Sequence, residues 1–125
     1  MEYKFTIPGR LDGLNDYTSA NRTNPYKGAK MKAEAEKTVM YSIRQQLHRL
    51  NIKAPVRLKY EFWEPNKRRD LDNISSFAHK VIQDSLVKTG VLVNDNWDYI
   101  IGYEDIFYVD KNNPRIVVTM LEVGG

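Results

Sequence analysis

The chain has 125 residues, no cysteine and a formal net charge of +3 at pH 7. This length fits one domain with one hydrophobic core, and the lack of cysteine excludes disulfides and thiolate metal sites. No apolar run reaches the length of a signal peptide or a membrane span, so we expect a soluble, cytoplasmic protein without membrane contact.

The charges are unevenly distributed along the chain. Residues 27–69 contain 12 Lys and Arg against 4 Asp and Glu, a net charge of +8. Residues 70–110 contain 8 Asp and Glu against 2 Lys, a net charge of −6. This division suits a protein that binds a polyanion with one part and a cation with another. Chance clustering of lysines on a long helix is the alternative.

The first half of the chain shows four clear patterns. Residues 2–7 alternate apolar and polar side chains and predict a strand, and residues 10–26 are polar and predict a long loop. In residues 27–50, apolar side chains recur every three or four positions, which predicts an amphipathic helix. Residues 56–63 alternate strictly and predict a half-buried strand.

The second half begins with a turn at Pro65 and Asn66. A helix is predicted from residue 72 or 73 to residue 89, with Gly90 as its stop signal. Residues 98–109 and 115–123 predict two strands, which would form an antiparallel hairpin across the turn between them. The expected fold is a single α+β domain over residues 1–125, a mixed sheet with two helices in the order β-α-β-α-β-β.

Residues 67–73 read Lys-Arg-Arg-Asp-Leu-Asp-Asn. Asp70 and Asp72 supply two carboxylates, the hard oxygen ligands that Mg²⁺ prefers. The cations before them would attract phosphate, and a metal beside bound phosphate is what phosphodiester hydrolysis requires. The alternative is that Asp72 and Asn73 only cap the following helix.

Three further residues are candidates for a site or an interface. Lys80 falls on the same polar arc of the predicted helix as Asp72, and Asp95 offers a third carboxylate in the turn after that helix. Trp63 lies on the polar side of its strand. Packing under a helix is the favoured interpretation of Trp63, over stacking on a base or packing in a dimer interface.

These motifs resemble the RusA family of Holliday junction resolvases over nearly the whole chain. The resemblance is centred on residues 68–73, followed by Lys80, Gly90 and Asp95. Its N-terminal part, residues 9–11 with Asn15, Tyr17, Tyr26 and residues 29–31, is similar to phage and prophage members of that family.

The resemblance implies a homodimeric, magnesium-dependent endonuclease that resolves four-way DNA junctions by paired symmetric nicks, in recombination and repair. The family's carboxylate triad falls on Asp70, Asp72 and Asp95, which would bind Mg²⁺. Its catalytic lysine falls on Lys80 when counted back from Asp95, whereas the ungapped position holds Ser76. The candidate DNA contacts are Lys67, Arg68, Arg69, Arg10, Arg22 and Lys30.

Two other functions stay open at this point. A protein that binds branched DNA without cutting it would need the cations but not the aspartates. A structural or assembly protein would use the aspartates only as helix and turn caps.

Overall fold

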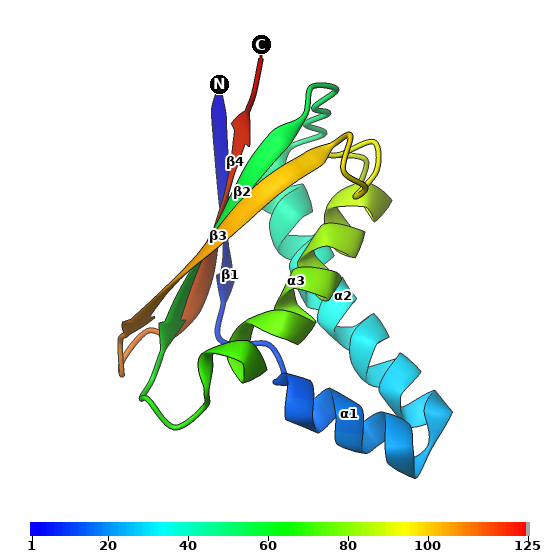
Figure 1. Cartoon of the computed structure of the whole chain (residues 1–125), viewed down its shortest axis with the longest axis vertical. Helices are drawn as coiled ribbons and strands as arrows, with labels where there is room; N and C mark the ends of the chain where they lie inside the picture. The colour runs from blue at the N-terminus through cyan, green and yellow to red at the C-terminus, as the bar shows by residue number, and fades with distance from the viewer. Residues whose placement is uncertain (125) are drawn as a thin grey trace.

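The fold is a four-stranded sheet with helices packed on one face (Figure 1). The computed structural model describes residues 1–124. Within these residues, no helix is long and apolar enough to cross a membrane. The elements in chain order are β1 (Glu2–Pro8), α1 (Leu14–Thr23), α2 (Pro25–Leu47), β2 (Val56–Glu64), α3 (Leu71–Lys88), β3 (Ile100–Val109) and β4 (Arg115–Glu122).

The strand order in the sheet is β1-β4-β2-β3. Strand β4 pairs antiparallel with both β1 and β2, while β2 and β3 are parallel. Parallel neighbours need a crossover connection, and α3 provides it between β2 and β3. The central strand β2 therefore leads directly into α3, and Asp70 lies at that junction.

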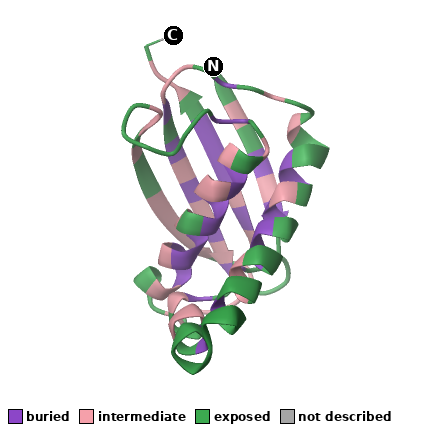
Figure 2. Cartoon of the chain, turned by 90° about the vertical axis from the view of Figure 1, so that its right-hand side faces the viewer, coloured by how far each residue is buried: buried purple, intermediate pink, exposed green. Residues whose placement is uncertain are grey.

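The hydrophobic core lies between the sheet and helices α2 and α3. The alternation of β2 is confirmed, because Val56, Leu58, Tyr60 and Phe62 are all buried. Figure 2 shows the buried residues as bands across the sheet beneath the helices. The helices supply the other side of this core, notably Val39, Ile43, Phe77, Val81 and Ile82.

The prediction of a loop over residues 10–26 was wrong, because residues 14–23 form α1. The order is therefore β-α-α-β-α-β-β, with three helices. The segment is rich in Asn, Thr and Ser, which are poor helix formers on their own. Packing compensates for this: Ala20 is buried, and the Tyr17 ring lies 4.6 Å from that of Phe77, centroid to centroid.

The expected hairpin of the last two strands was also wrong. β3 and β4 follow each other in sequence, but β2 lies between them. Ile116, Val118 and Met120 of β4 are fully or almost fully buried, whereas β3 has no buried residue. The more apolar inward side of β4 explains its inner position and the edge position of β3.

Trp63 does not pack under a helix as expected. Its ring stacks on Tyr108 with centroids 4.0 Å apart, and the Arg115 guanidinium carbon lies 4.2 Å from the Trp63 ring centroid. Since its neighbour Phe62 points into the core, Trp63 lies on the opposite face of the sheet. On that face, the Tyr108 ring and the Arg115 guanidinium pack on Trp63 in place of a helix.

Candidate metal and nucleic-acid site

Asp70 and Asp72 lie together at the start of α3. Asp70 is the N-cap residue, with φ −68° and ψ 155°, yet its side chain makes no capping hydrogen bond. Asp72 lies in the first turn, and both residues are exposed. The positive end of the helix dipole stabilises both carboxylates. Asp70 therefore does not act as a side-chain cap, and its carboxylate is available to a ligand.

Asn73 connects this helix start to α1. The backbone N–H of Asn15 donates to Asn73 Oδ1 at 2.8 Å, so Asn73 satisfies an unpaired donor in the first turn of α1. The N-cap of α1 is Gly13, and a Cβ there would lie 2.7 Å from Asn73 Oδ1. Asn73 thus caps a neighbouring helix, where the sequence had suggested a cap of its own helix.

Arg69 is bound to a buried carboxylate. Its Nη2 donates to both Glu64 carboxylate oxygens at 3.0 Å, its Nε donates to Oε1 at 3.2 Å, and its Nη1 donates to the Leu11 carbonyl oxygen at 3.2 Å. Arg10 Nη1 lies 3.5 Å from the same Glu64. The Glu64 side chain is only 6% exposed. Of the cations expected to contact phosphate, Arg69 is therefore already engaged by the fold, and Arg10 lies at the edge of the same pair.

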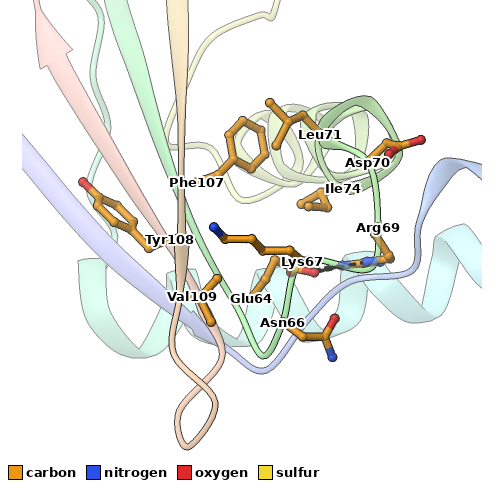
Figure 3. Close-up of a pocket in the computed structure, with 10 residues that line it drawn as sticks. All are labelled: Glu64, Asn66, Lys67, Arg69, Asp70, Leu71, Ile74, Phe107, Tyr108 and Val109. Carbon is orange, nitrogen blue, oxygen red and sulfur yellow. Dashed lines mark hydrogen bonds and ion pairs between the residues drawn. The ribbon is translucent and has the colours of Figure 1, made fainter.

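Lys67 and Arg68 are the cations that remain available next to the aspartates. Both are exposed, and no ion pair within residues 1–124 involves either side chain. The N–H of Arg68 donates to Asn66 Oδ1 at 3.0 Å, which shapes the turn that presents them. Figure 3 shows the Lys67 side chain reaching into the adjoining pocket while the Asp70 carboxylate points away from it.

This pocket has a volume of about 610 Å³ and separates the start of α3 from the end of β3. Its walls are mostly apolar, and Leu71, Ile74, Phe107 and Val109 are among the residues that line it (Figure 3). Leu71 is 57% exposed and Val109 is 48% exposed. An apolar hollow therefore lies directly beside the two carboxylates.

Arg22 and Lys30 do not lie beside the aspartates. Arg22 is in the last turn of α1 and Lys30 is on α2, and both are exposed. The corner between α1 and α2 lies away from the start of α3 (Figure 1). Any DNA that reached both cations and the carboxylates would have to span this distance.

Lys80 is also not in contact with Asp72. It lies eight residues further along α3, which corresponds to about 12 Å along the axis and about 80° around it. Lys80 is exposed, and no ion pair joins it to a carboxylate among the described residues. Ser76, at the ungapped family position, is one turn from Asp72 and half-buried.

Asp95 lies at the other end of α3 (Figure 1). It borders a second pocket, of about 520 Å³, together with Gln83, Trp97 and Tyr103. The side-chain oxygen of Asn94 accepts the backbone N–H groups of Asp95 and Asn96, so Asn94 shapes the turn. Asp95 is exposed and presents its carboxylate to solvent.

The expected meeting of Asp70, Asp72 and Asp95 does not occur within one chain. Residues 1–124 contain no group of three or more His, Asp or Glu side chains placed to hold one metal ion. Asp70 and Asp72 are two residues apart in the chain, at the N-cap and in the first turn of α3. Asp95 is separated from them by the length of α3.

The sequence patterns did not reveal the residues that support the site. Glu64, at the last position of β2, was not among the predicted site residues, and Asn73 was interpreted only as a possible cap of its own helix. His79 was also missed: its Nε2 lies 2.7 Å from Asp105 Oδ1, which joins α3 to β3 at this point. The contacts of Asn73 and His79 join residues 58 and 26 positions apart, and short-range spacing carries no signal for them.

No protein-family model and no curated protein matches this chain in sequence comparisons.

Proposed function

We propose that this protein is a magnesium-dependent endodeoxyribonuclease that resolves four-way DNA junctions by paired nicks. One observation carries the proposal. At the start of α3, the exposed Asp70 and Asp72 lie next to the exposed cations Lys67 and Arg68, and none of these four side chains has an ion-pair partner among the described residues. This arrangement places two carboxylates that could share a divalent cation next to two cations that could hold phosphate.

The chemistry of the donors fits Mg²⁺. This ion binds through one or two protein carboxylates and keeps waters and substrate phosphate oxygens as its other ligands. Asp70 and Asp72 would hold it. When bound, it would polarise the scissile phosphate and lower the pKa of a coordinated water. Lys67 and Arg68 would hold the DNA backbone beside the carboxylates, while Arg69 would keep the connecting turn in place.

The proposed homodimer gives Asp95 a place in this site. In a two-fold symmetric dimer, the start of α3 in one copy can meet the turn after α3 in the other, and the contact occurs twice. Apolar side chains are exposed at both ends: Leu71 and Val109 near Asp70, and Trp97 and Ile101 near Asp95. Trp97 is 92% exposed, and with Ile101 beside the same pocket it offers an apolar surface that a second copy could cover.

A second candidate function is a protein that binds branched DNA without cutting it. The separation of Asp95 from Asp70 and Asp72 within one chain favours it. Such a protein needs only its cations, because phosphate contacts dominate the affinity of both classes.

Cleavage of a synthetic mobile four-way junction, with and without Mg²⁺, separates the two functions. If the protein is a nuclease, it should make paired nicks that require Mg²⁺. Asp70→Asn and Asp72→Asn should abolish these nicks, while binding to the junction in EDTA is retained. Glu104→Gln removes an exposed carboxylate from β3 and serves as a matched control that keeps full activity. Binding by the unmodified protein without any Mg²⁺-dependent cleavage would establish the second function instead.

A further inference from the structure

The outward face of α2 carries a row of cations and tyrosines. At about 100° per residue, Tyr26, Lys30, Lys37, Tyr41 and Arg44 fall within an arc of about 60°. We call these five residues the α2 stripe. All five are exposed, and Tyr26 and Tyr41 are 84% and 63% exposed. The buried side of the same helix, with Ala35, Val39 and Ile43, faces the opposite way.

The fold makes little use of the stripe. No ion pair within residues 1–124 involves its three cations, and the one side-chain hydrogen bond of the stripe in this range runs from Gln45 Nε2 to the Tyr41 hydroxyl oxygen, at 2.9 Å. Of the two acids in α2, Glu36 is buried and paired with Lys88 at 2.9 Å, which removes its charge from this surface. The other, Glu34, is exposed at the border of the stripe.

Cations alternating with exposed aromatic rings have a known physical use. Lysine and arginine attract a phosphate backbone, and aromatic faces stack on bases that are not already stacked in a duplex. In the stripe, Lys30, Lys37 and Arg44 follow each other at steps of about 10.5 Å, and the two tyrosines stand before and between them. The bases of an intact duplex are covered on both faces, so only an unpaired strand can use the tyrosines.

We propose that the α2 stripe binds a single-stranded segment of nucleic acid, with its cations on phosphates and its tyrosines stacked on bases. This inference rests on the proposed action on branched DNA and specifies the substrate further. A branch with an unpaired arm, such as a fork or a flap, is held more tightly than the same branch with that arm paired.

Binding measured by fluorescence anisotropy in EDTA tests the inference without any cleavage step. The two ligands are a fork with one unpaired arm and the same fork with that arm annealed to its complement. Tighter binding of the unpaired form is expected. Tyr41→Ala should weaken that form alone by about five-fold or more, and Tyr41→Phe should restore the affinity because the ring is kept.

Charge variants test the cations of the stripe in the same assay. Lys37→Gln should weaken the salt dependence: the negative slope of log K against log salt should become smaller in magnitude by about 0.7, the value for one phosphate contact on a single strand. Lys111→Gln, which removes an exposed lysine from the turn between β3 and β4, should leave the slope unchanged. Glu34→Gln should raise the affinity for the unpaired form, since it removes the bordering negative charge.

Equal affinity for the two forks, or equal effects of Lys37→Gln and Lys111→Gln, would overturn the inference. These outcomes are distinguishable from failure of the nuclease proposal. A protein that cuts junctions but binds the two forks equally would refute only the inference about the α2 stripe. A protein that binds the unpaired arm through the α2 stripe but never cuts DNA would support the inference about the stripe and refute the nuclease proposal.

Discussion

The Arg69 guanidinium donates hydrogen bonds to both carboxylate oxygens of Glu64 at 3.0 Å and so connects the last residue of β2 to the residue before Asp70. The turn between them presents Lys67 and Arg68, and the helix that follows presents Asp72. A single buried ion pair therefore holds both charged parts of the candidate site in position. Arg69 acts as a positioning residue, since its donors are bound to Glu64 and to the Leu11 carbonyl oxygen.

Loss of this pair should reduce stability as well as activity. Arg69→Ala leaves Glu64 buried without its main partner, and we expect the free energy of unfolding to fall by about 3 kcal/mol. Lys67→Ala and Arg68→Ala remove exposed side chains and should change it by less than about 0.5 kcal/mol, while weakening junction binding. Urea denaturation measures the first effect and anisotropy the second. Equal stability of all three variants would show that the Arg69 pair has no such role.

The Asn73 side chain, which belongs to α3, should stabilise α1 through its hydrogen bond to Asn15. Asn73→Ala removes the acceptor for the Asn15 N–H, and the expected cost is about 1 kcal/mol, as for the loss of an N-cap. Asn73→Asp keeps an acceptor oxygen and is the matched control. Urea unfolding of both variants checks this. A loss of similar size in Asn73→Asp would mean that the amide group, rather than the acceptor oxygen, matters.

The turn between β3 and β4 should be sensitive to acid. A hydrogen bond from Arg115 lowers the pKa of Asp110 below its ordinary value of 3.8, with help from the N–H groups of Asn112 and Asn113. A lowered pKa in the folded state gives stability that is present above the ordinary value and is lost as the pH falls below it. The stability difference between the wild type and Asp110→Asn should therefore be larger at pH 7 than at pH 3.

Urea midpoints of the two proteins at both pH values measure this difference. Because Asp110 is on the surface, added salt should also reduce the difference. A gap between wild type and Asp110→Asn that stays constant with pH would contradict the account of this turn.

Several parts of the fold could be predicted because their signals are local. The alternation in β2 and the apolar spacing in α2 and α3 reflect burial of one side, and the structure confirms the buried side of each. Asp70 and Asp72 both lie at the start of α3, where the sequence predicted that this helix begins. The stop at Gly90 is also confirmed, since its φ of 81° is a conformation that glycine adopts without strain.

The rest depends on contacts between distant residues. Helix α1 forms from residues of low helix propensity because α2 and α3 give it a surface to pack on. The order of the sheet depends on which strand buries more apolar surface, and β4 exceeds β3 in this. The position of Asp95 depends on the length and direction of α3, so a motif that places three acids in one sequence pattern does not place them at one point in space.

The central claim is that Asp70 and Asp72 of one chain form a metal site with Asp95 of a second copy. Mixing Asp72→Asn with Asp95→Asn, by refolding them together in equal amounts, tests it directly with the four-way junction and Mg²⁺. Each variant alone should be inactive. About half of the dimers would be mixed, and each mixed dimer would regain one complete site, so nicking should return to about a quarter of the wild-type level. A mixture that binds the junction but stays inactive, or an Asp95→Asn protein that cuts as well as wild type, would contradict the claim.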